Sequence, residues 1–219
     1  MRVGFMHSGK AWHDATHQLA EIMVRSVHKT MPGVEIVQMC DLDTPMVRGV
    51  DTVIHRAVNG QGLMLYRLDH LRNFPAGDAM FIDTDAVVQR DVRPVFKKPF
   101  DVALTRRTGV ILVDGKDIVP EMPYNTGVIF SRSQEFWIDC YEHCATLSDK
   151  LKKWFGDQLA VRFVTESGEY NVMELTCNEY NYSPFTESED VSGRYVAHYK
   201  GVNRKFWMLN KYMATTEVT

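Results

Sequence analysis

Two aspartates interrupt an apolar stretch of the sequence. Asp83 and Asp85 stand one residue apart within the segment 80–88, which reads MFIDTDAVV. The flanking residues are typical of a buried strand, and charges are rarely left in a protein core without a partner. A divalent cation such as Mn²⁺ or Mg²⁺ would neutralise both carboxylates and could then hold a diphosphate. The alternative interpretation is a strand that ends in a solvated acidic turn.

A histidine near the end of the chain could complete such a metal site. His198 is followed by Lys200, Gly201 and Arg204. An imidazole and two carboxylates suit Mn²⁺ or Mg²⁺, while the basic side chains could bind a pyrophosphate that the Gly201 backbone approaches closely. A long stretch of chain separates His198 from the aspartates, so only the fold could join them. A structural histidine is the alternative.

Length and composition set further bounds. The chain has 219 residues, of which 45% are hydrophobic, and this predicts one domain spanning residues 1–219. No apolar run reaches the length of about 18 residues that a membrane helix needs, and the first residues lack the apolar core of a signal peptide. We therefore expect a soluble, cytoplasmic protein without a membrane span. Four cysteines in no zinc-like spacing are expected to be reduced thiols.

The charge of the chain says more about its partners. The net charge of −3 argues against a general nucleic-acid binder. A local excess of basic residues could still steer an acidic ligand toward the Asp83/Asp85 strand, although a solvated face would look the same. These basic residues are Arg90, Arg93, Lys97, Lys98, Arg106 and Arg107.

The order of apolar patterns and chain breaks predicts an α/β fold. Residues 2–8 read as a strand, apolar residues at helical spacing between Leu19 and Met31 predict a helix, and residues 34–39 alternate as a second strand. This opening favours a parallel sheet with a ligand crevice at the carboxyl ends of its strands. The loop 7–13 lies at that crevice, but it matches neither Gly-x-Gly-x-x-Gly nor the phosphate-binding loop.

The remaining sequence continues the alternation of strands and helices. Further strands are expected at 100–104, 124–130, 170–175 and 194–198, and further helices at 62–73, at 134–147 and from residue 154 onward. Asp157 is expected to be the N-cap of the last of these helices. Residues 41–60 and 178–193 read as loops, and residues 106–123 as a mobile loop or acceptor-side flap.

Read together, five segments resemble the motif series of retaining GT-A glycosyltransferases, most closely family 8, the galactosyltransferase and glycogenin-like enzymes. They stand in the order of that family, and the resemblance covers residues 2 to about 207. The segments are YRL at 66–68, FIDTD at 81–85, NTGV at 125–128, GDQ at 156–158 and HYKGVNR at 198–204. Several motifs in the correct order are far more specific than any one of them.

The resemblance implies a fold and an activity. The fold would be a single GT-A, Rossmann-like domain with a central mixed, mostly parallel sheet flanked by helices. The activity would be metal-dependent transfer of a hexose from a nucleotide diphosphate sugar to an acceptor hydroxyl with retention, and a UDP-sugar would be the donor. The cofactor would be Mn²⁺, or Mg²⁺.

The resemblance also implies roles for individual residues. Asp83, Asp85 and His198 look like the metal ligands, and Arg67 like the family's helical arginine near the donor sugar, where the alternative is a surface salt bridge. Asp157 looks like an acid that binds sugar hydroxyls, and Gln158 like the residue on the reacting face of the anomeric carbon. The donor-binding residues would be His7, Ser8, Asn125, Thr126, Lys200, Gly201 and Arg204.

Departures from the family pattern leave some questions open. Arg204 stands where the family usually has lysine, which keeps the charge but changes its geometry. The first loop offers His7, Ser8 and His13 in place of an acidic residue near the base, so the base and the sugar stay open. The acceptor could be a saccharide, a protein, a small molecule or, as a minority option, modified DNA. The oligomeric state is also open.

Two other functions compete with the glycosyltransferase interpretation. A sugar-phosphate nucleotidyltransferase on a related fold usually carries a glycine-rich, Arg-Lys-bearing loop after its first strand, and residues 7–13 do not supply one. A non-catalytic nucleotide-sugar-binding module would keep the same binding residues without turnover.

Overall fold

The computed structural model describes residues 1–8 and 14–213. Its strands are β1 (Arg2–Met6), β2 (Glu35–Cys40), β3 (Thr52–His55), β4 (Ala79–Ile82), β5 (Ala86–Val88), β6 (Val102–Arg106), β7 (Leu112–Val113), β8 (Lys116–Asp117), β9 (Tyr124–Ser131), β10 (Val172–Thr176) and β11 (Val196–His198). Its helices are α1 (Asp14–Thr30), α2 (Leu63–Arg72), α3 (Glu135–Thr146), α4 (Asp149–Lys153), α5 (Gly156–Glu166), α6 (Cys177–Tyr180) and α7 (Val202–Met213), with the 3₁₀ helix η1 at Arg93–Lys97.

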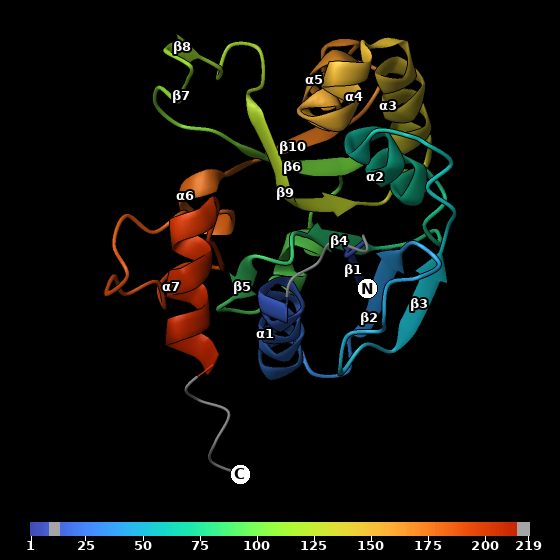
Figure 1. Cartoon of the computed structure of the whole chain (residues 1–219). Helices are drawn as coiled ribbons and strands as arrows, with labels where there is room; N and C mark the ends of the chain where they lie inside the picture. The colour runs from blue at the N-terminus through green and yellow to red at the C-terminus, as the bar shows by residue number, and fades with distance from the viewer. Residues whose placement is uncertain (9–13, 214–219) are drawn as a thin grey trace.

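Within the described residues, seven strands form one central sheet in the order β10-β6-β9-β4-β1-β2-β3. β9 runs antiparallel to its neighbours β4 and β6, and the other neighbouring pairs are parallel. In Figure 1 the helices α2 to α5 lie on one side of the sheet, and α1 lies on the other. The expected mixed, mostly parallel sheet flanked by helices is confirmed.

Alternating side chains of the sheet feed hydrophobic cores on both of its faces. Along β4, Met80 and Ile82 pack in the core that includes α1, whereas Ala79 and Phe81 pack in the core that includes α2, α3 and α5. Because strand residues alternate between faces, a central strand with both faces covered must be apolar throughout. This explains why the apolar run before Asp83 is continuous.

A short ribbon lies beside the sheet and carries part of the site described below. β5 pairs antiparallel with β11, and His198 at the end of β11 lies opposite Ala86 at the start of β5. α1 packs on β5 and α7 packs on α1, so the ribbon is held by helices from both ends of the chain (Figure 1).

The structure corrects several local expectations. Residues 41–60 contain strand β3, residues 178–180 of the expected loop 178–193 belong to helix α6, and the helices α4 and α7 were not expected from the sequence. Asp157 is inside α5, after the cap residue Phe155, so its assignment as an N-cap was wrong. Its position in the first turn still suits an acidic side chain, because the amide dipoles there favour negative charge. His13 lies outside the described residues.

No helix among residues 1–8 and 14–213 is long and apolar enough to cross a membrane.

The central strands predict where the fold is most sensitive. Phe130 on β9 is fully buried and contacts the rings of Phe96 and Tyr180. We expect Phe130→Ala to lower the free energy of unfolding by about 3–5 kcal/mol, because it removes buried surface and leaves a cavity. Urea unfolding followed by circular dichroism measures this. Phe185→Ala is the matched control, since Phe185 is 76% exposed and should change stability by less than about 0.5 kcal/mol.

Candidate active site

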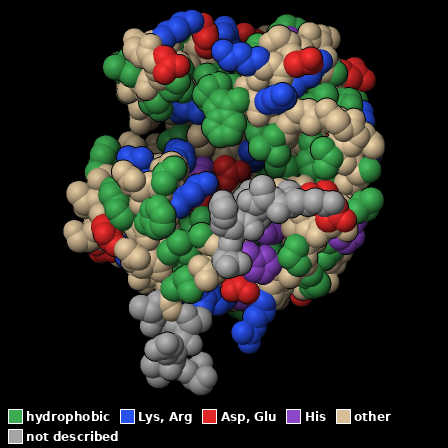
Figure 2. All heavy atoms as spheres, in the orientation of Figure 1, with side chains coloured by type: hydrophobic (Ala, Val, Ile, Leu, Met, Phe, Trp, Pro, Cys, Tyr) green, Lys and Arg blue, Asp and Glu red, His purple; other side chains and the backbone are tan. Residues whose placement is uncertain are grey.

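Polar residues from distant parts of the sequence meet at one edge of the central sheet. Asp83 follows β4 and Arg107 follows β6, so both lie at the carboxyl ends of parallel strands. Because β9 runs the opposite way, its first residues, including Asn125 and Thr126, lie at the same edge. Figure 2 shows a hollow on one face of the molecule, with acidic side chains inside it and lysine and arginine side chains around it.

The two aspartates and His198 form a cluster of possible metal ligands. One ligand atom from each of Asp83, Asp85 and His198 lies within 4.8 Å of the others. His198 Nε2 is 3.0 Å from Asp85 Oδ1 and 3.6 Å from Asp83 Oδ2. Asp85 and His198 are buried and Asp83 is half-buried. Two carboxylates and one imidazole are a donor set that fits Mn²⁺ or Mg²⁺.

Asn181, which the sequence placed in a loop, fixes which histidine nitrogen faces the carboxylates. The backbone N–H of Gly127 donates to Asn125 Oδ1, so that oxygen is an acceptor. The atom of the Asn181 amide beside it, at 2.8 Å, must then be Nδ2, which leaves Asn181 Oδ1 2.7 Å from His198 Nδ1. Nδ1 therefore carries the hydrogen, and Nε2 is the nitrogen directed at the aspartates.

Gly127 allows the histidine ring to approach β9. A Cβ atom at this position would lie 2.2 Å from His198 Cε1, which no side chain tolerates. The pairing of β6 with β9 is also irregular here, because Leu104 lies opposite Ile129 but Thr105 lies opposite Asn125. Bulges of this kind redirect side chains near functional sites. The Thr105 hydroxyl donates to the Asn125 carbonyl, so the backbone of the irregular segment is hydrogen-bonded.

Arg67 of α2 links the aspartates to the first turn of α5. Its guanidinium is 3.0 Å from Asp83 Oδ1 and 3.4 Å from Asp157 Oδ2, and it donates to the Thr126 carbonyl at 2.6 Å. Burial opposes its charge, but the nearby carboxylates outweigh burial and raise the Arg67 pKa. Arg67 is therefore a largely covered bridging residue whose side chain is 11% exposed, and the alternative of a surface salt bridge does not hold.

Asp157 and Gln158 lie side by side at the start of α5 but are held by different partners. Asp157 is 1% exposed, and its Oδ2 accepts a hydrogen bond from the Thr126 hydroxyl at 2.7 Å. Asp157 Oδ1 is buried and has no hydrogen-bond partner among the described residues. Gln158 Oε1 accepts from the guanidinium of Arg107. Phe155, just before this turn, has a φ of +72°, which is strained for a bulky residue.

The basic segment after His198 places Lys205 at the aspartates. Lys205 Nζ is 3.3 Å from Asp85 Oδ2. Burial opposes ionisation of Asp85, but His198 and Lys205 outweigh it and hold the Asp85 pKa well below its usual range. Arg204 instead donates to the Pro184 carbonyl at 2.7 Å. Burial lowers the pKa of Lys200.

His7 and Ser8 belong to a second polar cluster at the same sheet edge. The Ser8 hydroxyl donates to Asp41 Oδ2 at 2.7 Å, and Thr44 donates to Asp41 Oδ1 through both its N–H and its hydroxyl. Burial, and next the neighbouring His17, lower the pKa of His7 to about 4. Its ring is therefore neutral at pH 7. The cluster lies at the ends of β1 and β2, apart from the contacts described for Asp83 and Asp85.

The basic run between residues 90 and 107 is divided among local partners. Arg93 pairs with Asp91, and Arg106 pairs with Glu174. Arg107 is buried and faces the site. These contacts indicate that much of the positive charge in this run is bound to nearby partners and is not free to steer an acidic ligand.

Sequence reasoning missed three residues of this network. Lys205 adjoins Arg204, and the direction in which each side chain leaves α7 decides which of them reaches Asp85. The sequence alone does not show which of the two makes this contact. Arg107 was one cation in a basic run, and nothing marked it as buried. Asn181 stood in a polar segment that carried no signal.

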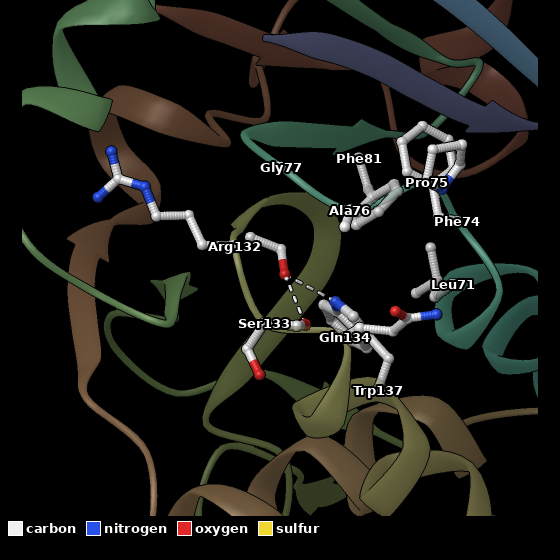
Figure 3. Close-up of a pocket in the computed structure, with 11 residues that line it drawn as sticks. Leu71, Phe74, Pro75, Ala76, Gly77, Phe81, Arg132, Ser133, Gln134 and Trp137 are labelled. Atoms are coloured by element: carbon white, nitrogen blue, oxygen red, sulfur yellow. Dashed lines mark hydrogen bonds between the residues drawn. The ribbon is translucent and has the colours of Figure 1, made fainter.

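A separate small pocket lies away from this site (Figure 3). It is lined by Phe74, Gly77 and Trp137 among others and has a volume of about 20 Å³, enough for little more than one water molecule. Gly77 precedes β4, so the pocket is at the strand end opposite Asp83. A pocket of this size cannot hold a molecule much larger than water.

Similar solved structures were found, all at low sequence identity. The galactosyltransferase LgtC, solved in complex with donor and acceptor sugar analogues, has a TM-score of 0.57 and 14% identity, covering 100% of this chain and 98% of that chain. The glycosyltransferase GlyE of Streptococcus pneumoniae TIGR4 has a TM-score of 0.61 and 15% identity, covering 98% of this chain and 64% of that chain. A glycosyltransferase involved in glycosylation of the major capsid of PBCV-1 has a TM-score of 0.62 and 12% identity, covering 97% and 100%.

Comparisons of sequence gave no such relatives. No family model matches the chain, and no curated protein matches it. At these identities the likeness concerns the fold, and the expectation of a GT-A glycosyltransferase fold is confirmed.

The role of Asn181 can be tested by metal binding. We expect Asn181→Leu to weaken Mn²⁺ binding about 10- to 100-fold, because His198 then loses the partner that fixes its tautomer. Isothermal titration with MnCl₂ measures the affinity. Asn178→Leu, in the exposed part of the same segment, is the control and should bind Mn²⁺ normally. Unchanged affinity in a folded Asn181→Leu variant would contradict this role.

Proposed function

We propose that the protein is a metal-dependent glycosyltransferase that moves a hexose from a nucleotide diphosphate sugar to an acceptor hydroxyl with retention at the anomeric carbon. A UDP-sugar is the proposed donor. The observation that carries the proposal is that two clusters of polar side chains are connected at one edge of the sheet. The possible metal ligands Asp83, Asp85 and His198 are joined through Arg67 to Asp157, which adjoins Gln158.

The possible metal ligands suit the diphosphate of such a donor. Asp83, Asp85 and His198 would hold Mn²⁺ or Mg²⁺, which when bound supplies positive charge for the leaving diphosphate. Lys205 contacts Asp85, and Lys200 lies near enough to Asp83 and Asp85 to be affected by their charge, so both basic residues border the proposed metal site. We assign the diphosphate contact expected for Arg204 chiefly to Lys205, because Arg204 is engaged with the Pro184 carbonyl.

Asp157 and its neighbours suit the sugar. The partnerless Oδ1 of Asp157 is a hydrogen-bond acceptor for a sugar hydroxyl, and such an acceptor is costly to leave buried without a donor. Thr126 and Arg67 fix the orientation of the carboxylate. Asn125 acts through Asn181 on His198 and also lies at this edge.

The proposed reaction takes place on one face of the sugar. The bond from the anomeric carbon to the diphosphate oxygen breaks, and its electron pair leaves with the diphosphate. The acceptor oxygen forms the new bond on the same face, and its proton passes to the leaving diphosphate. Gln158 is an amide and a weak nucleophile, so we favour this route over a covalent intermediate. A covalent Gln158 adduct detected by mass spectrometry would overturn it.

Two findings on LgtC support this assignment by analogy. LgtC has been solved with donor and acceptor sugar analogues, and also as an active-site mutant in which glutamine is replaced by glutamate. The present chain has an amide, Gln158, beside the proposed sugar-binding carboxylate.

Slow hydrolysis of the donor, with water in place of the acceptor, tests the proposed function and its two alternatives. The protein is incubated with UDP-glucose, UDP-galactose and other nucleotide sugars with MnCl₂ or EDTA, and free nucleoside diphosphate is measured. Mn²⁺-dependent release supports a glycosyltransferase. Pyrophosphate release from a nucleoside triphosphate and a sugar phosphate would indicate a nucleotidyltransferase instead. Binding without release of either product would indicate a non-catalytic module.

Two substitutions separate the metal site from the reacting face. We expect Asp85→Asn to abolish release of the nucleoside diphosphate, because it removes a charged metal ligand, and Gln158→Ala to reduce it only in part. Initial rates at saturating donor measure both effects. Asp149→Asn is the control, since that side chain is 94% exposed on α4 and its substitution should leave the rate unchanged.

The assignment of Lys205 is tested by donor affinity. We expect Lys205→Met to raise the Kd for UDP in the presence of Mn²⁺ about tenfold, because a charge-assisted contact with the diphosphate is lost. Arg204→Met should change the Kd less. Isothermal titration measures both, and the reverse order would return the diphosphate contact to Arg204.

A further inference from the structure

Arg107 is a buried cation at the root of the segment 107–123. It follows β6 directly, and its backbone N–H donates to the Pro123 carbonyl at 2.8 Å. Its guanidinium donates to the carbonyls of Met122 and Tyr124, so one side chain ties the outgoing strand to the returning one. The residue is only 9% exposed. These contacts fix the guanidinium in one place.

The hydrogen bonds of Arg107 go to neutral oxygens. Besides the carbonyls, its guanidinium donates to Gln158 Oε1, and Arg107 forms no ion pair with a carboxylate among residues 1–8 and 14–213. Burial lowers the Arg107 pKa, as expected for a cation with such partners. A buried charge without a carboxylate is costly. Among these hydrogen-bond partners Gln158 is the only side chain, so the guanidinium joins the ends of the segment 107–123 to the first turn of α5.

The chemistry of the guanidinium decides how the Gln158 amide is turned. A guanidinium offers only N–H donors, so the amide atom beside it must be Oε1. The NH₂ group of Gln158 is then directed away from Arg107. The neighbouring Asp157 is oriented by Thr126 and Arg67, and Gln158 is oriented by Arg107.

We propose that Arg107 is a positioning residue that holds Oε1 of Gln158 and leaves the Gln158 NH₂ group as a hydrogen-bond donor on the reacting face. This inference rests on the proposed function. The guanidinium occupies one of the two lone pairs of Oε1 and withdraws electron density from it, which makes this oxygen a weaker nucleophile for a covalent route. In this proposal Gln158 orients the substrates as a hydrogen-bond donor, which agrees with the partial loss expected for Gln158→Ala.

Kinetics of single and double variants test the coupling between Arg107 and Gln158. Release of UDP from UDP-glucose or UDP-galactose with MnCl₂ is measured in Arg107→Gln, Arg107→Lys, Gln158→Ala and the double variant Arg107→Gln/Gln158→Ala. We expect Arg107→Gln to lower kcat about tenfold or more, since small misplacements of reacting groups have effects of this size, with little change in donor KM. Arg107→Lys should recover part of the rate.

The double variant distinguishes positioning from general damage to the fold. If Arg107 acts through Gln158, Arg107→Gln should lower kcat less than about threefold when Gln158 is already alanine. An equal loss of kcat in both backgrounds, or no loss in either, overturns the proposal. Arg106→Gln is the matched control, because Arg106 is the adjacent arginine, has a 51% exposed side chain and pairs with Glu174 outside the site.

A spectroscopic readout keeps the test independent of turnover. The side-chain amide signal of Gln158 in a ¹⁵N-labelled sample is assigned by its absence in Gln158→Ala. We expect it to shift in Arg107→Gln, which removes the cation, and to stay in place in Arg106→Gln. An unchanged signal in Arg107→Gln overturns the contact even if the protein has no glycosyltransferase activity. If the signal shifts but no donor is turned over, the proposed function fails while the contact stands.

Discussion

The charge of Asp83 and Asp85 is the constraint on which the site depends. These carboxylates follow a strand whose side chains are buried on both faces, so water alone does not stabilise them. The fold supplies Arg67 from α2, His198 from β11 and Lys205 from α7. Each partner comes from a different part of the chain, so neutralising one acidic pair fixes how α2, α7 and the β5–β11 ribbon are arranged around the sheet edge.

The reversed direction of β9 is the second condition. Because β9 begins where the parallel strands end, its first residues reach the aspartates, and its irregular pairing with β6 exposes carbonyls that Thr105 and Asn181 bind. A single line of hydrogen bonds then runs from the Gly127 N–H through Asn125 and Asn181 to His198. Backbone geometry thereby determines which ring nitrogen of His198 carries the hydrogen. This is a form of preorganisation that the side chains alone would not provide.

The sequence predicts those residues of the site that are unusual for their local sequence context or that belong to an ordered series of motifs. Asp83 and Asp85 stand out because acids are unusual in an apolar strand, whereas His198 and Arg67 gained meaning from the order of motifs. Asn181 broke no rule, since an asparagine in a polar segment is ordinary. The start of α5 was misplaced because Phe155 adopts a left-handed φ that sequence patterns do not predict for an aromatic residue. Lys205 depended on the phase of α7, a helix that was not expected.

The two residues at the start of α5 show how the site is divided. Asp157 is fixed by Thr126 and Arg67, which also contact β9 and the metal-ligand cluster, whereas Gln158 is fixed through Arg107 by the segment 107–123. A displacement of that segment would therefore disturb the amide before it disturbed the carboxylate. Under the proposed function, the sugar-binding carboxylate and the amide on the reacting face would therefore be supported by separate contacts on adjacent residues. Such an arrangement would let the segment 107–123 vary with the acceptor while the contacts of Asp157 stay unchanged.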